Sequence, residues 1–325
     1  MSDTQKMSRR QFGQLVSLGL AGLSGMELVS SAPYARAEEP TVDPDLILWV
    51  SDTHVPADAE AEINQTCPAK NLRQIFEKIA AYNPHPASVC FCGDTVALEG
   101  KPEDYRTLRT ITAILDDAGI PWYVAFGNHD NREAFYDVFP EKRPTCVYVE
   151  GRHITVVETP HADLVLLDSL IRTNHTPGEL GEPQTKWIRS YLKETETTSS
   201  RPVYFAAHHP LVPGTAGGHS GLLDTDAFLK AIDGCDRVKG YIFGHSHAWG
   251  RYKTFAGMTL PVPDVLSPFV PKHITSVNLP ATGWLFADQP RGWVEMRLTE
   301  TGDSTFTLRT LDPTDVRNGA VHRLP

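Results

Sequence analysis

Three adjacent polar side chains follow a glycine in the segment FGNHDN, residues 126–131. The apolar run before it, PWYVAF at residues 121–126, has the length of a buried strand. An amide, an imidazole and a carboxylate in a row can form a turn, cap a helix or line a site for metal binding or proton transfer. The segment taken alone does not decide between these three interpretations.

Similar residues recur at the ends of four other apolar runs. Following these five runs, in chain order, are Asp52 and His54; Asp94; Asn128; His208 and His209; His245 and His247. Each is explained individually by a turn, a helix cap or a core histidine, but their recurrence favours one shared site, because ligands of α/β sheets bind at the carboxyl ends of strands. Carboxylates, imidazoles and one amide suit Mn, Fe or Zn better than Ca. Seven such ligands with one shared carboxylate are enough for two ions.

The elements that must position these residues alternate between strand and helix. Apolar residues recur at helical spacing in 72–79, 108–115, 187–192 and around 228–232. Strands are predicted at 46–51, 87–92, 121–126, 145–149, 153–158, 163–169, 203–207 and 238–243, and then, in a β-rich C-terminal segment, at 251–257, 273–279, 292–298 and 304–310. This order predicts an α/β fold with two mixed β-sheets packed face to face and helices outside.

Composition limits the class of protein. The chain has 325 residues, 41% of them hydrophobic, and a formal net charge of −10. An acidic chain offers no broad basic surface for nucleic acid, and its five cysteines contain no Cys-x-x-Cys metal framework. Because no linker interrupts the pattern, residues 45–325 are expected to form a single domain that includes the β-rich segment from about residue 250.

The N-terminal residues read as an export signal. Arg9 and Arg10 precede a weakly apolar run, and Ala35-Arg36-Ala37 has the pattern of a signal-peptidase site. Residues 1–37 are therefore predicted to be a cleaved twin-arginine signal peptide, followed by a leader at 38–44. The twin-arginine (Tat) export machinery would be a partner and the mature chain would be periplasmic or secreted. The run is too polar for a stable membrane anchor.

The motif set resembles that of a known family. Asp52-x-His54, Gly93-Asp94, Gly127-Asn128-His129-Asp130, His208 and Gly244-His245-x-His247 resemble, in family order, the five motifs of the calcineurin-like metallophosphoesterases. The resemblance covers about residues 45–250. The spacing and the LLDS and HHP segments are most similar to the bacterial branch that contains cyclic-nucleotide and glycerophosphodiester phosphodiesterases. NLPATGW and GWVEMRL are more weakly similar to the C-terminal segment of that branch.

The resemblance implies a role for each matched residue. One ion would be held by Asp52, His54 and His247, the other by Asn128, His208 and His245, and Asp94 would bridge the two ions. His129 is expected to be the general acid or to steady the phosphate, and Asp130 to orient the His129 ring by a hydrogen bond. Weaker candidates for substrate contacts are His209, Asn174, His175 and His219.

The expected function is that of an exported phosphodiesterase with two metal ions, which hydrolyses a small-molecule phosphate diester with a metal-activated water. A phosphomonoesterase or nucleotidase with the same metal centre is the alternative within enzymes. The alternative that is not an enzyme is a protein in which the metal ions only stabilise the structure. The choice among Mn, Fe and Zn, the natural ester and the oligomeric state are left open.

Overall fold

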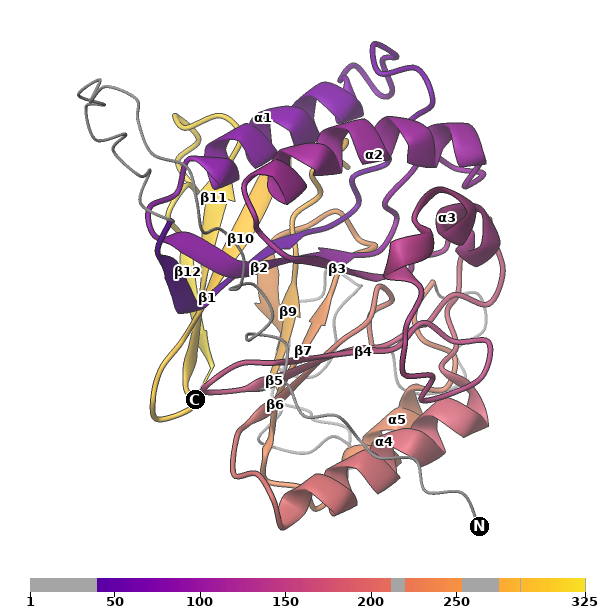
Figure 1. Ribbon diagram of the computed structural model, residues 1–325, viewed down its shortest axis with the longest axis vertical. Helices are drawn as coiled ribbons and strands as arrows, with labels where there is room; N and C mark the ends of the chain where they lie inside the picture. Colours follow the sequence, from indigo (N-terminus) through magenta and orange to yellow (C-terminus); the bar gives the residue numbers. More distant parts are fainter. Residues whose placement is uncertain (1–39, 212–219, 253–274, 287, 325) are drawn as a thin grey trace, which may run out of the picture. The chain divides into compact units, whose positions relative to one another are not determined.

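The computed structural model describes residues 40–211, 220–252, 275–286 and 288–324. Residues Pro40–Pro325 group into one compact unit. Within it, two six-stranded sheets each carry a pair of helices (Figure 1). The predicted signal peptide lies outside the described residues.

The first sheet joins the beginning of the chain to its end. Its strand order is β12-β11-β10-β1-β2-β3, with β1 at Val42–Val50, β2 at His85–Cys92, β3 at Trp122–Ala125, β10 at Gly292–Leu298, β11 at Ser304–Thr310 and β12 at Val321–Leu324. Strands β1, β2 and β3 are parallel, whereas β10 pairs with β1 in the antiparallel sense. The parallel register pairs Val50 with Phe91 and Cys92 with Ala125, so the carboxyl ends of β1, β2 and β3 meet at one edge.

The second sheet has the order β4-β5-β6-β7-β9-β8. The strands are β4 at Thr155–Glu158, β5 at Asp163–Leu166, β6 at Val203–Ala206, β7 at Val238–Phe243, β8 at Gly250–Tyr252 and β9 at Thr275–Asn278. Strands β5, β6, β7 and β9 are parallel, and the outer strands β4 and β8 are antiparallel to their neighbours. Ala206 pairs with Ile242, which brings the segments that follow β6 and β7 side by side.

Two pairs of helices cover the sheets. The helices of the described residues are α1 at Pro68–Ala80, α2 at Pro102–Asp117, α3 at Arg132–Val138, the short 3-10 helix η1 at Pro140–Lys142, α4 at Gly181–Glu196 and α5 at Thr225–Ile232. Helices α1 and α2 lie together on the first sheet, and α4 and α5 lie together on the second (Figure 1). Among the described residues, no helix combines the length and the apolar character needed to cross a bilayer.

Alternation along β1 shows how the layers form. Leu48 and Val50 pack in the cluster that contains the apolar face of α1, whereas Ile47 and Trp49 point to the other side and join Ile242 between the sheets. This is the period of two expected for a strand buried on both faces. A third cluster lies between the second sheet and helices α4 and α5. The predicted architecture of two mixed sheets with helices outside is confirmed.

The predicted strand at 145–149 is wrong. Residues 145–149 form bends without a sheet neighbour, and Val147 and Tyr148 are 65% and 39% exposed. An apolar run forms a strand only where a partner strand satisfies its backbone groups. Helix α3 was not predicted, although Asn131 caps it by accepting a hydrogen bond from the Ala134 N–H.

The β-rich C-terminal segment is largely as predicted. The runs at 273–279, 292–298 and 304–310 contain β9, β10 and β11, and β12 is an additional strand at the sheet edge. The run predicted at 251–257 begins within β8, and the rest of it lies outside the described residues.

Candidate metal centre

The seven predicted ligands lie at the carboxyl ends of five strands in the two sheets. Six of the seven are buried, and His245 is partly buried. Five have a backbone φ in the left-handed region: Asp52 at 49°, His54 at 44°, Asp94 at 49°, His245 at 66° and His247 at 51°. Non-glycine residues rarely take this conformation. Such strain gathers at functional sites, and here it turns each side chain inward as its strand ends.

The first ligand group consists of Asp52, His54 and His247, whose ligand atoms lie close enough to share one cation. The Nδ1–H of His247 donates to the Trp284 carbonyl oxygen at 2.9 Å. The neutral His247 ring therefore presents a lone pair at Nε2, which lies 3.3 Å from Asp52 Oδ1 and 3.2 Å from His54 Nε2. Converging lone pairs of this kind fit a cation.

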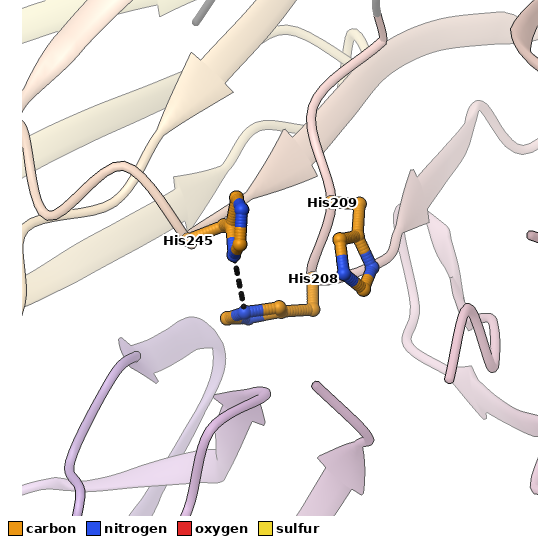
Figure 2. A group of neighbouring side chains, drawn as sticks. All are labelled: His208, His209 and His245. Carbon is orange, nitrogen blue, oxygen red and sulfur yellow. Dashed lines mark hydrogen bonds between the residues drawn. The ribbon is translucent and has the colours of Figure 1, made fainter. Parts of the chain in front are cut away.

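The second group consists of His208, His245 and Asn128. The Nδ1–H of His208 donates to the Cys92 carbonyl oxygen at 2.9 Å, which leaves Nε2 bare in the neutral ring. Figure 2 shows this Nε2 facing His245, whose Nδ1 lies 3.2 Å away. The side-chain oxygen of Asn128 is buried and has no hydrogen-bond partner among the described residues. A buried acceptor without a donor is costly unless something else satisfies it, and a metal ion would do so.

Asp94 connects the two groups. Its Oδ2 lies 3.1 Å from His208 Nε2 in the second group and 3.9 Å from His54 Nε2 in the first. Its Oδ1 accepts a hydrogen bond from the His129 backbone N–H at 2.8 Å, which fixes the carboxylate. One carboxylate therefore reaches both groups, and the donor set of carboxylates, imidazoles and an amide fits Mn, Fe or Zn.

Two glycines leave the room that the carboxylates need. A Cβ on Gly127 would overlap the side chain of Asp94, and a Cβ on Gly244 would overlap Ser51 and the Asp52 carboxylate. Because the glycines before Asn128 and His245 have no side chain, the ends of neighbouring strands can approach each other closely there.

Charge coupling shapes the protonation of the ligands. Burial alone would raise the pKa of Asp94, but the neighbouring His208 outweighs it and holds that pKa well below the usual range. Burial would likewise lower the pKa of His208, but Asp94 raises it to about 9. Burial lowers the pKa of His54 to about 3. His54 is thus neutral near pH 7, whereas without metal the proton of this pair lies on His208 and Asp94 is ionised. A metal ion would displace that proton on binding.

His129 stands beside the ligands with a defined tautomer. Its Nδ1 lies 3.0 Å from the Leu98 carbonyl oxygen and 2.9 Å from Asn174 Oδ1. Because a carbonyl oxygen can only accept, Nδ1 carries a hydrogen. The other nitrogen, Nε2, lies 4.0 Å from Asp94 Oδ2 and so faces the ligand cluster as the atom that gains or loses a proton.

The expected contact between Asp130 and the His129 ring is not found, so that expectation is corrected. Asp130 is fully buried. Its Oδ1 accepts hydrogen bonds from the N–H and hydroxyl of Thr95 and from the Tyr105 hydroxyl, and its Oδ2 accepts from the Gly127 N–H at 2.8 Å. Burial raises its pKa to about 6. Asp130 therefore holds the turn that presents Asn128 and His129, and the ring is oriented by other groups.

His209, expected to contact substrate, is also corrected. Its Nε2–H donates to the Thr176 carbonyl oxygen at 2.8 Å, and its Nδ1 accepts from the Ser169 hydroxyl at 2.8 Å. The residue is fully buried, and it packs beside His208 and His245 (Figure 2). With both nitrogens engaged, His209 anchors the loop at 170–180, although its ring also lies close enough to those of His208 and His245 to share an ion with them.

The remaining candidates lie on that loop or outside the described residues. The Asn174 backbone N–H donates to the Asn128 carbonyl oxygen at 2.7 Å, and its side chain contacts His129 as given above. His175 is half-buried, and among the described residues its ring makes no hydrogen bond with a predicted ligand. His219 lies outside the described residues.

Trp284 is a site residue that sequence reasoning did not single out. Its indole stacks on His54 with ring centroids 3.8 Å apart, and its carbonyl oxygen accepts from His247. The preceding Gly283 N–H donates to the Asp52 carbonyl oxygen at 2.9 Å. The only sequence signal was the weak similarity of NLPATGW, which carried no residue role. The C-terminal segment thus supports all three residues of the first ligand group.

The chain is similar to a known family and to known bacterial proteins. Residues 46–249 match the family described as calcineurin-like phosphoesterase. A probable glycerophosphodiester phosphodiesterase of Arcobacter nitrofigilis is 29% identical over 168 residues, 51% of this chain and 58% of that protein. A 3′,5′-cyclic adenosine monophosphate phosphodiesterase of Pseudomonas aeruginosa is 27% identical over 206 residues, 62% of this chain and 69% of that protein. The expected similarity to bacterial phosphodiesterases is confirmed, although the chain spans little more than half of the first relative.

Solved structures show the same fold. A dimetal phosphatase from Danio rerio aligns with a TM-score of 0.62 at 16% identity, over 83% of this chain and 97% of that chain. A purple acid phosphatase from yellow lupin aligns with a TM-score of 0.57 at 16% identity, over 86% of this chain and 53% of that chain. At this level of identity the likeness establishes the arrangement of the two sheets.

Proposed function

Since this chain belongs to the calcineurin-like phosphoesterase family, we propose that it is a metal-dependent phosphoester hydrolase, and specifically an exported phosphodiesterase that works with two metal ions. The observation that carries the two-ion proposal is the position of Asp94, whose Oδ2 lies between His208 and His54 at 3.1 and 3.9 Å. A carboxylate placed between two ligand groups is suited to bridge two cations. The preference for diesters is supported by the relatives, which bear phosphodiesterase names.

Each group would hold one ion. Asp52, His54 and His247 would bind the first, Asn128, His208 and His245 the second, and Asp94 both. When bound, the ions supply Lewis-acid stabilisation of the phosphoryl oxygens and activation of water at neutral pH. Mn, Fe and Zn all accept this donor set.

His129 supplies the proton that the departing alkoxide needs. Its Nδ1–H is held by Leu98 and Asn174, so a second proton can enter only at Nε2, on the side of the ligand cluster. The protonated ring can donate from Nε2 to the leaving oxygen, which is general-acid catalysis. Loss of the leaving alcohol then returns the ring to its neutral tautomer without a change at Nδ1.

Export rests on the sequence of residues 1–37. The Arg9-Arg10 pair, the weakly apolar run and the Ala35-Arg36-Ala37 site support delivery to the periplasm or the medium by the Tat machinery. Cell fractionation would test this proposal, with both arginines replaced by lysine in a matched variant. Mature protein outside the cytoplasm only in the wild type supports export, and equal distribution of the two contradicts it.

The activity test compares one diester with its matching monoester. The mature protein is stripped by a chelator and reloaded with Mn, Fe or Zn singly. It is then assayed on bis(p-nitrophenyl) phosphate and p-nitrophenyl phosphate, with His129→Ala as the matched variant. Metal-dependent diester cleavage that collapses in the variant supports the proposal, and a preference for the monoester moves the function to a phosphomonoesterase or nucleotidase. Two bound ions without turnover of either ester would favour a non-catalytic metal-binding protein.

A further inference from the structure

An aromatic ring stands exposed beside the first ligand group. Phe286 is 55% exposed, and its ring centroid lies 4.5 Å from that of His247 at an interplanar angle of 39°. An exposed large aromatic ring loses the benefit of burial. At the rim of a catalytic centre, such a ring has an evident use as a surface against which part of a substrate can pack.

The position of this ring is set by the backbone before it. The Thr282 N–H donates to the Ser51 carbonyl oxygen and the Gly283 N–H to that of Asp52, each at 2.9 Å. Trp284 then accepts from His247. Phe286 follows only two residues later, so its backbone is tied closely to the first ligand group. The Phe286 ring is therefore held next to His247.

A pocket opens next to Phe286. It has a volume of about 570 Å³, within the usual range of about 300–1000 Å³ for small-molecule sites. It is lined by Asn64, Gln65, Thr66, Leu285, Phe286 and Arg291. It thus combines an aromatic face with two amides and one guanidinium, and Phe286 connects it to His247 of the first ligand group.

Arg291 is held with its charge available. Its Nη1 donates to the Thr66 hydroxyl, and within the described ranges it makes no ion pair with a carboxylate. Asn71 donates to the same hydroxyl oxygen, which fixes its place. Arg291 is the one charged side chain among the described residues that line this pocket. On its other side it lines a separate pocket of about 380 Å³ that also contains Asp288, Asp312, Asp315 and Arg317.

We propose that this pocket is a nucleobase subsite, with Phe286 as the stacking surface and Arg291 as a donor to the base edge. Aromatic rings stack on nucleobases, guanidinium groups donate to their acceptor atoms, and side-chain amides pair with their edges. A glycerol-type alcohol has neither a planar face nor such an edge. This inference rests on the proposed phosphodiesterase function and adds that the ester group carries a base. Phe286 and Arg291 lie outside the 46–249 range of the family match.

The test measures binding separately from turnover. Metal-loaded protein is titrated calorimetrically with adenosine 5′-monophosphate and with glycerol 3-phosphate, which share the phosphate and differ in the base. The wild type is expected to bind the nucleotide at least about 10-fold more tightly. Phe286→Ala should weaken binding of adenosine 5′-monophosphate about 10-fold, and Phe286→Trp should retain the wild-type affinity. Affinity for glycerol 3-phosphate should stay within about twofold in each variant, and Tyr148→Ala is the surface-aromatic control.

Turnover then separates the two proposals. Values of kcat/KM are measured for 3′,5′-cyclic AMP and glycerophosphocholine with the wild type, Phe286→Ala and Arg291→Gln. Selective loss on the cyclic nucleotide supports the subsite. Equal affinity for the two monoesters, or equal losses on both diesters, overturns the subsite and leaves the phosphodiesterase function standing. Base-dependent binding without hydrolysis of any diester leaves the subsite standing and overturns the proposed function.

Discussion

The Trp284 indole stacks on the His54 imidazole, with ring centroids 3.8 Å apart and ring planes at 20°. The same tryptophan is nearly buried and comes from the C-terminal segment, about 230 residues away in the chain. Replacing a group that orients a metal ligand typically costs about 10- to 100-fold in metal affinity or activity. The C-terminal segment is therefore part of the candidate metal centre.

Trp284→Ala should weaken metal binding by about 10-fold or more, because His54 loses the surface that fixes its ring. Trp284→Phe should retain most of the affinity, since a ring remains in the stack. Competition with a fluorescent chelator measures both, and Trp187→Ala on α4 is the matched control. Equal affinity in Trp284→Ala and wild type would show that the stack is only packing.

Asn174→Gly should lower kcat by about 10-fold with little change in KM, because the His129 ring loses one of the two acceptors at Nδ1. Glycine is chosen because Asn174 has a φ of 59°, a conformation that alanine would strain. His129→Ala should cost about 100- to 10,000-fold. Both are measured at equal metal content, with His175→Ala as the control. A raised KM at unchanged kcat would return Asn174 to the role of a substrate contact.

Asp130→Asn should lower the free energy of unfolding by about 1–3 kcal/mol. Both carboxylate oxygens of Asp130 now accept hydrogen bonds, whereas the NH2 group of an asparagine would face one set of these donors and could not accept from them. Urea unfolding measures the change, with the exposed Asp137→Asn on α3 as the matched control. Metal-loaded activity of the folded variant should stay within about threefold, or about 0.6 kcal/mol in the barrier. A large loss of kcat at full metal content would restore Asp130 as the residue that orients His129.

Chelation should lower the melting temperature, because ions that bind only the folded state stabilise it by mass action. The effect is about 3 kcal/mol when free metal is 100 times its dissociation constant. Calorimetry with and without EDTA measures it. A variant with His54→Ala and His208→Ala should respond far less, since each ligand group loses an imidazole. An equal shift in this variant would place the stabilising ion elsewhere.

His153 should make the free energy of unfolding depend on pH. Burial lowers its pKa to about 4, and its Nδ1 accepts from the Tyr136 hydroxyl at 2.6 Å. Because the unfolded chain binds the proton at a higher pH, near 6.5, the contribution is present above pH 6.5 and is lost as the pH falls toward 4. The expected loss between pH 7.5 and pH 5 is about 2 kcal/mol.

The measurement is urea unfolding of chelated wild type and His153→Gln at both pH values. The difference between the two proteins isolates His153 from the other titrating groups. The variant should lose about 2 kcal/mol less than the wild type over this interval. Equal pH dependence in the two proteins would show that His153 keeps an ordinary pKa in the folded state.

Local patterns identified most of the fold. Helix-type spacing predicted α1, α2, α4 and α5, because each buries one apolar face on a sheet. The run at 145–149 failed because strand formation depends on a neighbour that local sequence does not specify. Helix α3 was missed because it is only seven residues long, and its signal was the Asn131 cap.

The sequence by itself determined which residues are of a type that can do chemistry, and that these residues follow directly after strands. This was possible because each strand, the turn after it and the candidate ligand lie within a few residues of one another. The sequence therefore predicted the seven candidate ligands and His129 before any fold was known. Only the tertiary structure decided the partners. It placed Asp130 in a turn, used both nitrogens of His209, gave the Nδ1 of His129 to Leu98 and Asn174, and brought Trp284 onto His54. These contacts join residues up to 230 positions apart, and a hydrogen bond or a stack depends on distances that chain-local patterns do not encode.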